Sequence, residues 1–173
     1  MNDIDKAALL KGYRRWQDVI QFVAPECSWE IGAIAFRESA WNPDAYRPEP
    51  RFYEKYIAAD TPTAIEWRKR IDDHGWQRVK CATSYGLMQI MFTTAWERGY
   101  RGKRAGPDGL LVPEVSLLYG AMHFRWLWEK YGRILDAVAA YNAGSPRHLD
   151  STSYVNQEYV DKVLAARDVL RVA

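Results

Sequence analysis

The sequence predicts a mainly α-helical protein with a small β element, an α+β fold. Three observations lead to this expectation. Apolar residues recur at helical spacing over several long segments, prolines and glycines mark several of the segment ends, and the alternation typical of strands is scarce. The chain has 173 residues, enough for one domain with its own core. We therefore expect a single domain spanning residues 1–173.

The helices are expected in a definite order. The first runs from Ile4 to Val23 and ends before Pro25, which cannot continue it. The second, 28–40, can be capped by Ser28 and is apolar nearly all round, so we expect it at the centre. The segment that starts at Gly86 is expected to become helical. Four more helices are predicted: 63–73 closed by Gly75, 113–131 closed by Gly132, 134–143 stopped at Gly144, and 156–172.

The connecting segments are rich in turn-forming residues. Residues 41–53 hold three prolines and are expected to form a turn or an extended loop. Residues 102–109 and 145–153 are also expected as loops. A small hairpin is expected within 43–83, where it would line a cleft.

Composition limits the class of partner and cofactor. The net charge is only +2, which lacks the basic footprint of a nucleic-acid-binding protein. No apolar run is long enough to cross a membrane, and the acidic residues Asp3 and Asp5 argue against a signal peptide. Cys27 and Cys81 show no metal-ligand spacing, so we expect no metal and no cofactor. Two buried free thiols are favoured over a disulfide between them. We also expect a monomer.

Glu38 breaks the pattern of its surroundings. It follows the apolar run "IGAIAF" and precedes Trp41. The C-terminal end of a helix and an apolar environment both disfavour a charged carboxylate and so raise its pKa. A carboxyl that stays protonated near neutral pH is what a general acid requires. The alternative is an ordinary surface glutamate.

Two further stretches combine small, apolar and amide side chains. In "SYGLMQIM", from Ser84 to Met91, the amide of Gln89 lies among apolar residues and must either tie the core together or face a polar ligand. In "AAYNAG", Tyr141 and Asn142 place a hydroxyl and an amide at a helix end, where Asn142 could instead be a simple cap.

In their order along the chain, "ESAWNP", "GLMQIM", "AAYNAG" and "EYV" closely resemble the motifs of soluble-type lytic transglycosylases. These lysozyme-like enzymes cleave peptidoglycan. The resemblance covers about 28–163 and implies a lysozyme-like fold, with peptidoglycan glycan strands as substrate. It makes Glu38 the catalytic acid and base and Tyr141 the residue whose hydroxyl orients it. It implies that the cleft is lined by four further residues: Gln89, Met91, Asn142 and Tyr159.

The chain departs from the family pattern at several positions. Residues 48–83 form a long insertion between the catalytic glutamate and "GLMQIM". Arg47 stands where the family often has a serine, and Ser84 is a candidate to replace that hydroxyl. The residues before the last tyrosine motif are Val155 and Asn156. The segment "AYRPEPRFYEKY" also resembles phage muramidase-like proteins and makes Glu49 a candidate second carboxylate.

Two kinds of activity and one non-catalytic function remain open at this point. A transglycosylase needs only Glu38 and leaves 1,6-anhydromuramoyl ends. A muramidase needs a second carboxylate, for which Glu49 and Asp44 are the candidates. A glycan-binding or structural part of a virion or secretion apparatus would need neither. The expected place of action is the cell wall, reached by lysis or by delivery from a phage or secretion machinery.

Overall fold

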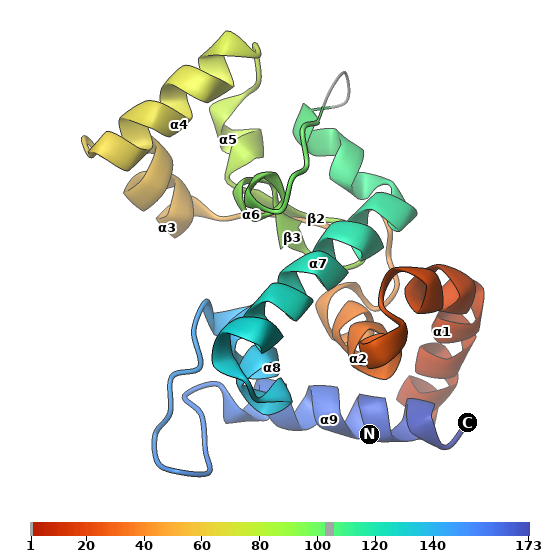
Figure 1. The fold of residues 1–173 in the computed structure, drawn as a ribbon. Coiled ribbons are helices and arrows are strands. Elements are labelled where there is room, and N and C mark those ends of the chain that lie inside the picture. The colour runs from red at the N-terminus through yellow and green to blue at the C-terminus, as the bar shows by residue number, and fades with distance from the viewer. Residues whose placement is uncertain (1, 103–105) are drawn as a thin grey trace.

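A computed structural model describes residues 2–102 and 106–173, and its larger part is a helical assembly (Figure 1). The helices α1 (Asp3–Val23) and α2 (Ser28–Ser39) pack together with three later ones. These are α7 (Pro113–Tyr131), α8 (Ile134–Ala143) and α9 (Gln157–Arg171). Figure 1 shows α7 running through the middle of the molecule, with α9 along its lower edge. The mainly helical prediction is confirmed.

The ends of these helices follow local chemistry. The Asn2 side chain accepts a hydrogen bond from the amide of Asp5 at 2.8 Å and caps α1. Gly132 and Gly144 end α7 and α8 in the left-handed conformation, with φ of 74° and 77°. Ser28 begins α2, but Cys27 occupies the cap position and makes no side-chain cap bond, so the expected serine cap does not form.

The central position predicted for α2 is confirmed by its burial. Ile31, Ala33, Ile34 and Ala35 have no exposed surface. Gly32 lets α1 and α9 approach closely, because a Cβ there would lie 2.6 Å from the Tyr13 ring and 2.9 Å from a Leu170 methyl.

A small antiparallel sheet joins β1 (Tyr46–Pro48), β2 (Thr83–Tyr85) and β3 (Ile90–Met91) in that order. Arg47 pairs with Ser84, which in turn pairs with Met91. The hairpin is therefore β2–β3, which begins where the expected region 43–83 ends. Residues 86–89, expected to start a helix, form its turn, and α6 (Phe92–Glu97) begins only after β3.

The region 48–83 is mostly helical and packs into a second hydrophobic cluster. It contains α3 (Pro50–Tyr53), a π-helical turn (Glu54–Ala58), α4 (Pro62–Asp73) and α5 (Arg78–Cys81). Of the loop expected over 41–53, residues 41–45 form turns and irregular structure, and the rest is β1 followed by the short helix α3. Trp67 and Ile71 are buried in this second cluster with Phe92 and Leu110, separate from the one around α2. Figure 1 shows α3, α4 and α5 on one side of the sheet, away from α1 and α9.

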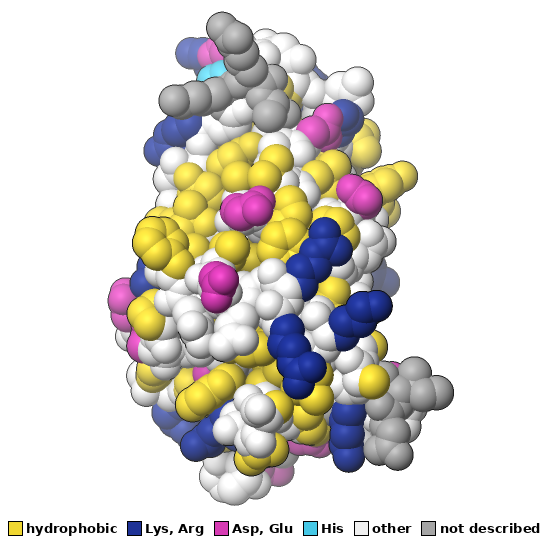
Figure 2. Space-filling model, turned by 90° about the vertical axis from the view of Figure 1, so that its right-hand side faces the viewer, with side chains coloured by type: hydrophobic (Ala, Val, Ile, Leu, Met, Phe, Trp, Pro, Cys, Tyr) yellow, Lys and Arg dark blue, Asp and Glu magenta, His cyan; other side chains and the backbone are white. Residues whose placement is uncertain are grey.

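The remaining expectations concern loops, thiols and surface. Of the loop expected at 102–109, residues 103–105 lie outside the described part, and Gly106–Leu111 form a 3₁₀ helix. Cys27 and Cys81 are free and buried, and burial raises the pKa of each thiol to about 12. Figure 2 shows basic and acidic side chains on one face, as the small net charge predicts. In the described residues no helix is long and apolar enough to cross a bilayer.

Candidate active site

Glu38 lies in the last turn of α2, immediately after its buried segment. The helix stops because Ala40 and Trp41 both adopt left-handed conformations, with φ of 48° and 66°. Such conformations are unfavourable for residues other than glycine and persist only where the surroundings fix them. Here the Trp41 ring packs on α1 at Gly12, where a Cβ would lie 2.1 Å from the Trp41 Cδ1 atom. Packing at Trp41 therefore fixes the turn next to Glu38.

The partner of the Glu38 carboxyl is Tyr159 on α9. The Tyr159 hydroxyl donates a hydrogen bond to Glu38 Oε1 at 2.6 Å. The Arg37 guanidinium lies 5.9 Å from the centre of the Tyr159 ring. We expected Tyr141 to orient this carboxyl, but its hydroxyl donates to the Met88 carbonyl instead, so an orienting role for Tyr141 stays a prediction. Tyr159, expected only as a cleft residue, makes the bond.

The surroundings favour a protonated Glu38. Burial is the largest influence and raises the pKa of this carboxyl, and the charge of Glu49 raises it further. The Tyr159 hydrogen bond, Arg47 and Arg37 lower it in part, and the net shift is upward. The direction predicted from the sequence is thus confirmed, with burial as its main cause. A raised pKa is suited to a general acid.

Tyr141 supports the "GLMQ" turn from α8. Its hydroxyl donates to the carbonyl of Met88 at 2.9 Å, and burial, followed by the charge of Glu38, raises its pKa well above the usual value. The Met88 amide in turn donates to Ser116 on α7 at 3.0 Å. The Ser39 hydroxyl lies 2.9 Å from the Leu87 carbonyl and joins the end of α2 to the same turn.

Gln89 ties this turn together with its side-chain amide. Its Nε2 atom lies 2.9 Å from the Ala45 carbonyl and 3.0 Å from the Gly86 carbonyl. Gln89 itself has a positive φ of 45°. A Cβ on Gly86 would lie 2.5 Å from the Leu110 carbonyl oxygen, so this position needs glycine. Of the two roles expected for Gln89, the structure shows the tie between backbone segments.

Glu49, Ser84 and Arg47 form a second polar group on the sheet. Glu49 Oε1 accepts hydrogen bonds from Arg47 Nε at 2.7 Å and from the Ser84 hydroxyl at 3.2 Å. Ser84 is 3% exposed. Met91, half-buried, is the neighbour of Ser84 on β3. Asp44 is exposed.

Asn142 is exposed and connects α8 to the start of α9. Its Oδ1 atom accepts a hydrogen bond from Asn156 Nδ2 at 3.1 Å, and the same Nδ2 lies 3.0 Å from the Ala139 carbonyl. Asn142 is therefore more than a helix cap. It helps to fix the segment that leads to Tyr159.

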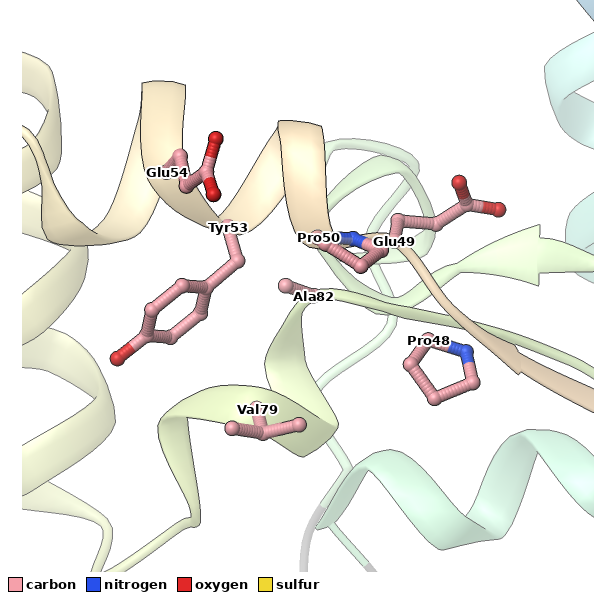
Figure 3. Close-up of a pocket in the computed structure, with 7 residues that line it drawn as sticks. All are labelled: Pro48, Glu49, Pro50, Tyr53, Glu54, Val79 and Ala82. Carbon is pink, nitrogen blue, oxygen red and sulfur yellow. The ribbon is translucent and has the colours of Figure 1, made fainter.

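An apolar cavity of about 180 Å³ lies in the region 48–83, next to Glu49 (Figure 3). Pro48, Pro50, Tyr53, Val79 and Ala82 line it, with Glu49 and Glu54 at its edge. Figure 3 shows the Glu49 carboxylate directed away from the Tyr53 ring. Among the aromatic residues of the region 48–83, Tyr53 lines this cavity, whereas Trp67 and Trp76 pack in the second hydrophobic cluster.

Four residues that support the site were missed in the sequence. Ser39 and Ser116 hold the "GLMQ" turn, and Gly12 and Gly120 make room for Trp41 and Met88. The glycines inside helical segments were a usable signal, because a glycine there is less favourable than alanine and so points to a packing constraint. Among residues 2–102 and 106–173, no group of three or more His, Cys, Asp or Glu is placed to hold a metal.

The family model "Transglycosylase SLT domain" matches residues 27–163. The chain belongs to this family. The matched range of the SLT domain extends from the start of α2 into α9, so it includes both Glu38 and Tyr159. Family membership assigns a general role, cleavage of glycosidic bonds in peptidoglycan. A comparison with curated proteins found no match.

Proposed function

We propose that this SLT domain is a peptidoglycan lytic transglycosylase that cleaves the bond between N-acetylmuramic acid and N-acetylglucosamine. The observation that carries the proposal is Glu38, a carboxyl with a raised pKa and a tyrosine donor on one oxygen. Because Tyr159 donates to Oε1, the proton of the neutral carboxyl is best placed on Oε2, free to be donated.

In the first step, Glu38 donates its proton to the glycosidic oxygen as the bond to the anomeric carbon breaks. The sugar becomes oxocarbenium-like, and the oxygen of its own N-acetyl group stabilises the positive charge. Glu38 is now a carboxylate, stabilised by the Tyr159 hydroxyl and by the charges of Arg47 and Arg37.

In the second step, Glu38 takes the proton of the sugar's 6-hydroxyl group. The 6-oxygen then forms a bond to the anomeric carbon, which closes the 1,6-anhydro ring. Glu38 returns to its protonated state. One carboxyl thus serves as acid and then as base, with no need for a positioned water.

A muramidase activity is the second candidate, because Glu49 is the carboxylate whose charge acts on Glu38. In a hydrolase it would activate water or attack the sugar. Against this candidate, Glu49 Oε1 already accepts hydrogen bonds from Arg47 and Ser84, so this oxygen is occupied in the protein itself.

Mass spectrometry of digested peptidoglycan separates the two candidates. We expect 1,6-anhydromuramoyl products, lighter by one water than hydrolysed ends. Glu49→Gln should leave the product type unchanged and slow the reaction only modestly. If reducing muramic acid ends dominate and Glu49→Gln or Asp44→Asn removes them, the enzyme is a muramidase.

We also propose that the first part of the insertion 48–83 forms a wall of the glycan cleft, since Glu49 connects it to the surroundings of Glu38. The phage-type assignment rests on the "RPEPRF" element, and the genes that surround the coding sequence would test it. A zymogram with peptidoglycan would exclude the non-catalytic alternative if a cleared band appears.

A further inference from the structure

Arg47 is an exposed cation whose head group is held in place. Its side chain is 64% exposed, yet its Nε–H donates to Glu49 Oε1 at 2.7 Å. Glu49 is fixed in turn by the hydroxyl of buried Ser84, the residue opposite Arg47 in the sheet. An exposed arginine usually samples many conformations. Here the sheet and Glu49 together restrict the guanidinium.

Most of the hydrogen-bonding capacity of Arg47 is unused. A guanidinium has five N–H groups, and only the Nε–H of Arg47 is hydrogen-bonded within the described part of the chain. Its two terminal NH₂ groups are left for a ligand. Guanidinium groups bind carboxylates with two parallel N–H bonds, which fixes both distance and orientation.

Arg47 also lies beside the surroundings of Glu38. Its strand β1 pairs with β2, and the carbonyl of Ala45, two residues before it, is bonded by Gln89 of the "GLMQ" turn. The Ser39 hydroxyl joins the same turn to the end of α2, next to Glu38. In keeping with this placement, the charge of Arg47 lowers the pKa of Glu38, as does that of Arg37. The sheet thus presents one oriented cation beside the reacting carboxyl, in addition to Arg37 on α2.

We propose that Arg47 is a substrate-recognition residue that binds a carboxylate of peptidoglycan beside the bond cleaved at Glu38. This inference rests on the proposed function. N-acetylmuramic acid carries a side chain that ends in a carboxyl, which is free in strands without peptide. In strands with peptide, that carboxyl is bonded to the peptide, whose own carboxylates are then available. Neutral glycans such as chitin have neither.

An ordinary surface ion pair is the competing interpretation of Arg47 and Glu49. Exposed pairs of this kind contribute little to stability. Stability alone therefore gives little reason to hold an arginine at this position. A recognition role makes use of the fixed head group and of its free donors.

The test compares KM and kcat on three substrates. The first is peptide-free strands with free muramoyl carboxyls, the second is the same strands with these carboxyls converted to methylamides, and the third is peptide-bearing strands. Arg47→Gln should raise KM about five- to thirtyfold on a substrate whose carboxylate is bound, the range expected for a partly exposed charge-assisted pair. On the methylamide strands it should change KM less than about twofold. Arg47→Lys keeps the charge but loses the paired geometry. It should therefore raise KM on the substrate whose carboxylate is bound, but by less than Arg47→Gln does.

Arg125→Gln is the matched control, because Arg125 is another surface arginine paired with a glutamate, Glu26, and lies on α7, outside the proposed cleft wall. It should leave all three KM values unchanged. A KM increase confined to the first substrate places the carboxylate on the muramoyl group, and one confined to the third places it on the peptide. An equal increase on the methylamide strands, or an equal effect of Arg125→Gln, would overturn the inference. Failure of the proposed function looks different: the parent protein would yield no 1,6-anhydro ends from any substrate.

Discussion

The end of α2 and the region 48–83 each present a glutamate near the sheet, but in different surroundings. Glu38 lies in the last turn of α2 and accepts a hydrogen bond from the Tyr159 hydroxyl, and burial is the main cause of its raised pKa. Glu49 accepts hydrogen bonds from the Arg47 guanidinium and the Ser84 hydroxyl. The comparison supports Glu38 as the proposed acid, because environment and not residue type distinguishes the two carboxyls.

The largest expected effect comes from Glu38→Gln. The amide keeps the volume and can accept the Tyr159 bond, but it cannot donate a proton to the leaving group. Loss of the acid should lower the rate by about 10²–10⁴-fold, and further because the same group is the base. Turnover of a soluble muropeptide substrate measures this. Activity within about tenfold of the parent would show that Glu38 is not the catalytic group.

Trp67→Ala tests how much the region 48–83 contributes to the stability of the protein. Trp67 is 8% exposed and packs against Trp96, with ring centroids 6.5 Å apart. Removal of a buried tryptophan should cost about 3–5 kcal/mol of unfolding free energy, which chemical denaturation would measure. A loss below about 1 kcal/mol would contradict this burial. Tyr53→Ala is the matched variant in the same region, and should lower glycan affinity with little loss of stability.

The two tyrosines near Glu38 provide the next comparison. Tyr159→Phe removes the hydroxyl that contacts the acid, so turnover should fall about tenfold, the equivalent of one hydrogen bond to a charged group. Tyr141→Phe removes a bond to a backbone carbonyl, and should cost about 1 kcal/mol of stability with a smaller effect on turnover. A larger loss of turnover in Tyr141→Phe at equal folded fraction would return the orienting role to Tyr141.

The smallest expected effects are shifts with pH. Activity should decline as pH rises through the raised pKa of Glu38, and Tyr159→Phe should move this decline to higher pH because that hydrogen bond lowers the pKa. The folded state binds the Glu38 proton more tightly than the unfolded state. Its contribution to stability is therefore present at low pH and lost as pH rises through the folded pKa.

Glu38→Gln should consequently be more stable than the parent at about pH 8, and closer to it at about pH 4. Melting temperatures at the two pH values measure the difference, with roughly 2–4 °C expected per kcal/mol for a chain of this size. If Glu38→Gln is less stable than the parent at both pH values, the folded protein accommodates the charged carboxylate better than its burial indicates.

The sequence by itself determined the long helices, the family and the candidate for the acid. These depend on local information: the spacing of apolar residues, the terminating glycines at 132 and 144, and short motifs such as "ESAWNP". The helix 113–131 was predicted with its observed bounds for this reason. The sequence also indicated that Glu38 would have a raised pKa, since an apolar run precedes it.

Only the tertiary structure decided which groups meet. That Tyr159 and not Tyr141 donates to Glu38 depends on how α9 crosses α2, a contact between distant parts of the chain. The segment from Gly86 becomes helical at α6, as predicted, but the turn at 86–89 was not foreseen. Its conformation is fixed by Ser116, Tyr141 and Ala45, all distant in sequence. The short helix α3 was hidden by prolines, which start a helix as readily as they end one. Local patterns determine elements, but the partners of a side chain are set by packing between elements, and no local pattern contains that information.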